Sequence, residues 1–188
     1  MTPGINLPKS YVKVYYPKGA VFNVITLKTS SGSIELQQVF VSDLDTSTSS
    51  GKIDASVVNC DVVKAATQSG SVRLGCSGDL ATKLTASTSS GSIRADGAAW
   101  RDAYTKTHSG FTEIKGELLG QTDVKTSSGA VQLIVDSDPS QYGYYLTASS
   151  GSIHWDGVKM GKPARSSGSY ENNINIDTSS GSIRVDFK

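Results

Sequence analysis

A short motif, Thr29-Ser30-Ser31-Gly32-Ser33-Ile34, recurs in altered copies along almost the whole chain. Aligned on the glycine of each copy, successive motifs are separated by 19, 19, 21, 19, 19, 22 and 30 residues. The aligned glycines are Gly32, Gly51, Gly70, Gly91, Gly110, Gly129, Gly151 and Gly181. A nearly constant period of this length indicates a repeat architecture, in which each unit packs mainly on its neighbours.

Apolar residues alternate with polar ones on both sides of each aligned glycine. The residues seven, five and three positions before the glycine, and two and four after it, are apolar or threonine. In the second copy they are Leu44, Thr46, Thr48, Ile53 and Ala55. A period of two predicts two short strands, each with one buried face, that meet at a corner. We expect glycine at the corner because a left-handed residue with a Cβ would be strained by roughly 1–2 kcal/mol.

A third mainly apolar position lies ten residues before the next glycine. It holds Val41, Cys60, Ala81, Trp100 and Leu119. Three inward segments in a 19-residue period predict an all-β, single-stranded parallel β-solenoid with three short strands per turn. We expect the coil to be right-handed, because crossovers between parallel strands almost always are. One domain is expected, with roughly eight or nine turns over residues 25–188.

The two ends of the chain depart from the repeat. Residues 1–24 are expected to cap the first turn, with an alternating strand over residues 11–16. Four lysines, Lys9, Lys13, Lys18 and Lys28, precede the first acidic residue. They fit either a solvated edge that discourages end-to-end pairing or attraction to an anionic envelope surface. Near the other end, the extra residues 136–141 and 157–173 predict loops that leave the coil.

Outward charges three residues after the glycines predict ion pairs between neighbouring turns. Stacking would set Asp54 beside Arg73, and Arg94 beside Glu113. Exposed pairs of this kind are worth ~0.2–1 kcal/mol and mainly help to fix register.

Composition excludes several classes of protein. Lysine and arginine number 18 against 17 acidic residues, so no overall basic field is present and nucleic acid is not an expected partner. The sequence has neither an apolar run that could span a membrane nor a signal leader, so we expect any leader or anchor to lie outside this chain. Cys60 and Cys76 are too few for a disulfide framework or a zinc site. We expect both to be reduced, with a bridge between neighbouring turns as the alternative.

The stretches Leu27 to Leu36 and Ile174 to Val185, with the degenerate copies between them, resemble a bacterial adhesin-like family of β-solenoid domains of unknown function. The resemblance covers about residues 10–188. It implies a secreted or cell-envelope location, often as the outer part of a membrane-anchored bacterial protein. It supplies no catalytic residues.

The sequence offers little for catalysis. The sequence lacks phosphate-loop and dinucleotide motifs, and it lacks the calcium-binding repeat of other β-rolls. Its acidic residues are dispersed along the repeats, and its only histidines are His108 and His154. We therefore expect no cofactor, no metal and no enzyme activity. The predicted function is adhesion, recognition or scaffolding at the cell envelope, with a glycan, an envelope polymer or another envelope protein as partner. A polysaccharide lyase or hydrolase on a β-helix is the alternative, whereas inward-facing threonines argue against ice binding.

One candidate ligand-binding surface follows from the outward positions six, four and two residues before three successive glycines. Its candidate residues are Tyr104, Lys106, His108, Asp123, Lys125 and Tyr145. If turns stack in chain order, Tyr104 and Tyr145 lie roughly 10 Å apart with Asp123 between them. Two aromatic platforms beside a polar strip suit sugar rings, and the lysines suit an anionic polymer. The alternative is that exposed tyrosines merely favour strands.

Overall fold

The computed structural model describes residues 12–78 and 82–188, and nearly all of its regular structure is β-strand. The strands are β1 (Val21–Thr29), β2 (Ile34–Thr48), β3 (Ile53–Val58), β4 (Val62–Thr67), β5 (Val72–Ser77), β6 (Thr82–Ser90), β7 (Ile93–Ser109), β8 (Thr112–Leu119), β9 (Gln121–Ser128), β10 (Val131–Val135), β11 (Tyr142–Ser150), β12 (Ile153–Trp155), β13 (Val158–Met160), β14 (Ala164–Arg165), β15 (Asn172–Ser180) and β16 (Ile183–Phe187). A short 3-10 helix, η1, spans Pro139–Gln141. In the described residues no helix is long and apolar enough to cross a membrane.

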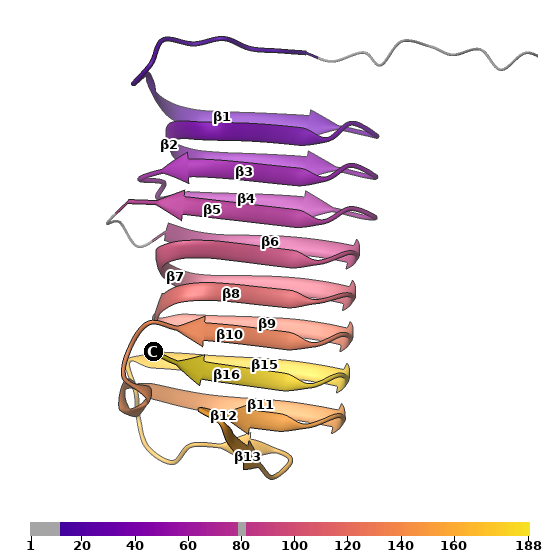
Figure 1. Cartoon of the computed structure of the whole chain (residues 1–188), viewed down its shortest axis with the longest axis vertical. Helices are drawn as coiled ribbons and strands as arrows, with labels where there is room; N and C mark the ends of the chain where they lie inside the picture. The colour runs from indigo at the N-terminus through magenta and orange to yellow at the C-terminus, as the bar shows by residue number, and fades with distance from the viewer. Residues whose placement is uncertain (1–11, 79–81) are drawn as a thin grey trace, which may run out of the picture.

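The strands stack into two layers, one behind the other in Figure 1. Strands that precede an aligned glycine form the pre-glycine layer: β1, the second half of β2, β4, β6, the second half of β7, β9, β15 and β11. Strands that follow a glycine form the post-glycine layer: the first half of β2, β3, β5, the first half of β7, β8, β10, β16 and β12. All these pairings are parallel and repeat about every 19 residues, which confirms the predicted parallel β-solenoid.

The third inward segment is present but does not form a separate strand in the described turns. β2 and β7 instead run on from one layer to the other, with register irregularities where they bend. Val41, Cys60 and Trp100 are buried as predicted, whereas Ala81 lies outside the described residues. Leu119 is only half-buried and Leu118 takes the inward position, because β7 carries a bulge opposite β8.

The last turn of the chain lies inside the stack rather than at its end (Figure 1). β15 pairs with β9 on one side and with β11 on the other, and β16 lies between β10 and β12. The expectation that turns stack in chain order is therefore wrong for the final copy. Its inward residues match those of its neighbours, and Ile174, Ile176 and Ile183 are all buried. The same apolar pattern thus fits either place in the stack.

The N-terminal end of the coil differs from the expected cap. β1 already belongs to the first turn, and residues 12–16 form no strand. Val12, Val14 and Tyr15 are exposed, so the predicted capping strand is wrong there, while Tyr11 lies outside the described residues. Among the contacts between described residues, those of Tyr16 anchor this segment: its hydroxyl donates to the Gln37 carbonyl at 3.1 Å, and its ring packs edge-on against Phe22.

The opposite end is covered by the segment that was predicted to leave the coil. Within residues 157–173, β13 pairs antiparallel with β12, and β14 pairs antiparallel with β11. The core here ends in an aromatic cluster, formed by Tyr142, Tyr144, Trp155 and Phe187, with ring centroids 4.1 to 5.4 Å apart. This excursion is therefore a cap rather than a free loop.

The aligned glycines form a column through the whole stack. A Cβ built on Gly91 would overlap the carbonyl oxygen of Gly70, and the same overlap recurs at Gly51, Gly70, Gly110, Gly129, Gly181 and Gly151. Of the eight, only Gly110 and Gly151 have a positive φ, so a left-handed backbone is not the reason for glycine at the other corners, Gly91 included. These glycines are required chiefly because neighbouring turns approach more closely than a side chain permits.

In the turns that contain Gly51 and Gly70, the threonine three residues before the glycine bridges two turns. The Thr48 hydroxyl accepts a hydrogen bond from its own Gly51 N–H at 3.1 Å and donates to the Gly32 carbonyl of the preceding turn at 3.0 Å. Thr67 repeats both bonds. The N–H groups of Gly91, Gly110, Gly129 and Gly181 donate instead to a serine carbonyl of the adjacent turn. In these first turns, the inward threonine hydroxyl therefore explains why the motif combines threonine with glycine.

The glycine column leads to a stability prediction. Gly91→Ala should lower the free energy of unfolding by ~2–3 kcal/mol or more, because the new methyl group forces two turns apart. Gly32→Ala is the matched control, because Gly32 lies in the first turn and its nearest Cβ neighbour is the Thr29 hydroxyl at 3.0 Å. Urea denaturation measures both variants, and equal midpoints would contradict the close stacking.

Both cysteines are free and buried. The Cys60 Sγ is 3.2 Å from the Val62 carbonyl, and the Thr82 hydroxyl donates to the Cys60 carbonyl at 2.6 Å. The Cys76 Sγ is 3.1 Å from the same hydroxyl. Burial raises the pKa of the Cys60 thiol from 9.0 to about 11.

This shift predicts how stability changes in alkaline solution. The unfolded thiol ionises near pH 9.0 and the folded one near 11, so its contribution is complete below pH 9 and is lost as pH rises towards 11. Because other side chains also ionise in alkaline solution, the comparison is with Cys60→Ala. We expect the unfolding free energy of the variant to fall less steeply between these pH values in urea titrations. Identical slopes would show that the Cys60 thiol is not perturbed.

Candidate functional site

The six residues predicted to bind a ligand all lie on the pre-glycine layer. Tyr104, Lys106 and His108 project from β7, Asp123 and Lys125 from β9, and Tyr145 from β11. Tyr104 is 37% exposed and Tyr145 is 50% exposed, as expected for outward positions.

The inserted last turn changes the spacing between the two tyrosines. Tyr104 pairs in register with Asp123, Asp123 with Asn175, and Asn175 with Tyr145. Three strand spacings separate the tyrosines, or ~14 Å, rather than the expected two spacings of ~10 Å. The expectation was wrong because it assumed that Tyr145 lies on the turn next to Asp123.

Asn175 is the residue that the sequence analysis missed in this row. Its Nδ2 donates to the Asp123 Oδ1 at 3.2 Å, and the Gln121 Nε2 donates to the same oxygen at 3.4 Å. Asn175 lies six residues before Gly181, so the alignment itself marks it as outward-facing. We call the row Tyr104, Asp123, Asn175 and Tyr145 the tyrosine strip.

Charged side chains line one flank of the tyrosine strip. Lys106 and Lys125 are adjacent in register, and Lys125 is adjacent to Asp177 on β15. The Thr147 hydroxyl donates to the Asp177 carboxylate at 2.6 Å. The flank is therefore cationic beside Tyr104 and becomes anionic towards Tyr145.

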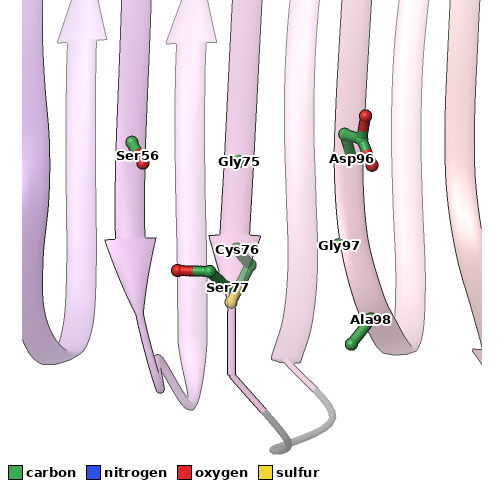
Figure 2. Close-up of a pocket in the computed structure, with 7 residues that line it drawn as sticks. All are labelled: Ser56, Gly75, Cys76, Ser77, Asp96, Gly97 and Ala98. Carbon is green, nitrogen blue, oxygen red and sulfur yellow. The ribbon is translucent and has the colours of Figure 1, made fainter.

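An open hollow of about 440 Å³ lies on the post-glycine layer, a region that the sequence analysis did not single out. Figure 2 shows Ser56, Gly75 and Asp96 side by side on β3, β5 and β7. The hollow exists because Gly75 has no side chain between its two polar neighbours. The available signal was an outward-facing glycine inside a predicted strand, which often marks close approach of another group.

Beside this hollow the predicted ion pairs between turns do not form. Asp54 and Arg73 are adjacent in register, as are Arg94 and Glu113, so their placement is as expected. A lysine two residues away in the sequence binds each carboxylate instead. These ion pairs are Lys52 to Asp54 at 2.5 Å and Lys115 to Glu113 at 3.1 Å. Within the described part of the chain, Arg73 and Arg94 therefore have no carboxylate partner.

The two arginines lie next to each other in register, on β5 and β7. A second hollow of about 40 Å³ lies beside them and is lined by Lys52, Ser71, Val72, Arg73, Ser92 and Arg94. The Arg94 guanidinium lies over the Phe111 ring, 5.8 Å from its centroid. We call Arg73 and Arg94 the arginine pair.

Comparison with known proteins identifies the chain only at the level of a family. The model of the Toastrack DUF4097 family matches residues 4–186. No curated protein and no solved structure matches the chain. Since the family model covers nearly the whole sequence and the fold is a parallel β-solenoid, this chain belongs to the Toastrack DUF4097 family, whose function is unknown.

Proposed function

We propose that this domain is a non-catalytic recognition module of the bacterial cell envelope or the extracellular space, which binds a glycan or envelope polymer along the tyrosine strip. The observation that carries the proposal is the row itself. Two exposed tyrosines flank a hydrogen-bonded Asp123–Asn175 pair on a face whose strands are held in register by the stacked turns.

The chemistry of the row suits a sugar chain. Sugar rings have apolar faces that stack on aromatic rings and polar edges that hydrogen-bond to carboxylates and amides. A separation of ~14 Å between the tyrosines favours an extended oligosaccharide over a single ring. The Asp123 carboxylate is already oriented by Asn175 and Gln121, so little ordering is lost when it binds a hydroxyl.

A hydrolase is the second candidate, and one observation favours it. Asp123 on β9 and Asp177 on β15 are diagonal neighbours, because Asp177 lies two residues after Asn175, the register partner of Asp123. Residues in this diagonal relation on paired strands lie ~7–8 Å apart. Carboxyl groups of inverting glycosidases are separated by a similar distance, ~6.5–9.5 Å. Against this candidate, each carboxylate already accepts a hydrogen bond from a neighbouring side chain on an open face.

The recognition proposal predicts that the tyrosines dominate binding. Tyr104→Ala combined with Tyr145→Ala should weaken binding to any polymer identified on a glycan and envelope-polymer array by at least ~10-fold, because both stacking platforms are lost. Tyr15→Ala removes an exposed tyrosine outside the strip and serves as the control. Calorimetric titration measures the affinities, and circular dichroism checks the fold. Undiminished binding by the folded double variant would exclude the tyrosine strip.

Turnover distinguishes the two candidates. Every polymer that binds should be incubated with the protein, and newly formed reducing ends should be counted. We expect none. Release of reducing ends that disappears in the Asp123→Asn and Asp177→Asn variants would favour the hydrolase.

A further inference from the structure

We propose that the post-glycine layer carries a second binding site, specific for an acidic saccharide. In this site the arginine pair binds the oxyanion of the sugar, and the hollow above Gly75 receives its ring. The site lies on the layer opposite the tyrosine strip and does not depend on that strip's function.

The first argument is the placement of two like charges. Arg73 and Arg94 project outward from adjacent positions on neighbouring strands. Like charges directly opposite each other destabilise a sheet, unless something neutralises them. An oxyanion between the two guanidinium groups would do so, and arginine is the side chain best suited to bidentate binding of carboxylate, sulfate or phosphate.

The second argument is that the nearest acids are already engaged. Asp54 and Glu113 flank the arginine pair in register, but each is bound by a lysine two residues away in the sequence, Lys52 and Lys115. The charge of the arginine pair is therefore not neutralised by a neighbouring carboxylate in the described residues. Ser71 and Ser92 line the smaller hollow on one side of the pair, where their hydroxyls can donate to an anion.

The third argument is the larger hollow on the other side of the pair. Gly75 lies two residues beyond Arg73 on β5, which corresponds to ~7 Å along the strand. The hollow of about 440 Å³ falls within the usual size range of small-ligand pockets, ~300–1,000 Å³. Ser56 and Asp96 lie on either side of Gly75 and can hydrogen-bond to ring hydroxyls. Because Asp96 repels an anion, the acidic group must point towards the arginines, which sets the orientation of the sugar.

The arginine pair is tested by removing its charge. The probes are a galacturonic acid oligomer, a sulfated galactose oligomer of the same length and the uncharged galactose oligomer, each titrated calorimetrically at one ionic strength. The native protein should bind an acidic probe, and Arg73→Gln with Arg94→Gln should weaken this binding at least tenfold. The control, Arg101→Gln with Arg165→Gln, removes the same charge from exposed arginines elsewhere and should change binding less than twofold.

The three probes and the two double variants distinguish a carboxylate ligand from a sulfate ligand, and binding at the arginine pair from general attraction of anions. Preference for the galacturonic acid oligomer or for the sulfated oligomer identifies carboxylate or sulfate as the bound group, and either supports the site. Equal losses in both double variants, equal binding of the uncharged oligomer, or no binding of either acidic probe would overturn it.

The hollow is tested separately by filling it. A Cβ on Gly75 would meet only the Ser56 Oγ, at 3.9 Å, so Gly75→Val should leave the melting temperature nearly unchanged. The valine side chain would occupy the space assigned to the ring, and binding of the preferred acidic oligomer should fall at least tenfold. Native affinity in this variant would show that the ring does not lie above Gly75, and would overturn the proposed site.

Discussion

The close contact between aligned glycines sets the distance and the register between neighbouring turns. Each aligned glycine after Gly32 has no room for a Cβ against the carbonyl oxygen of the glycine one turn away. In the first turns, threonine hydroxyls such as that of Thr48 join a glycine N–H to the carbonyl of the neighbouring turn. Because every turn passes through this one narrow corner, the strands on both sides of it are held in register. Outward residues at equivalent positions therefore form straight rows across the stack.

Both proposed binding surfaces are products of this register. The tyrosine strip collects one outward position from four neighbouring turns, and the arginine pair collects another from two. A regular face with equal side chains would be featureless. What distinguishes these places is local variation within the repeat: aromatic residues at Tyr104 and Tyr145, and a missing side chain at Gly75. The constant motif builds the scaffold, and the variable outward positions provide its chemistry.

The segment between β12 and β15 both caps the end of the stack formed by β11 and β12 and leads the chain back to form the inserted last turn. After β12 the chain crosses the exposed end of the stack, where β13 and β14 pair with β12 and β11 and cover the aromatic cluster around Trp155. It then enters between β9 and β11 as β15. The final turn thereby has a neighbour on both sides. The first turn has no such cover in the described residues, so Phe22, Ile25 and Leu27 remain half-buried.

The parallel solenoid, its period and most of its inward positions could be predicted from the amino-acid sequence, because the alternation is local and the Thr-x-x-Gly spacing recurs in most turns. The sequence also placed Tyr104, Asp123 and Tyr145 on one outward face. Which turns are neighbours could be read only from the folded chain. Equivalent repeats present the same backbone edge and the same inward residues to a neighbouring turn. Nothing in the apolar pattern therefore distinguishes β15 from β11 as the partner of β9. For this reason the position of Asn175 between Asp123 and Tyr145 could not be predicted. The salt bridges could not be predicted from the sequence for a related reason. Both Lys52 and Arg73 lie within reach of Asp54, and side-chain geometry rather than the strand pattern selects between them.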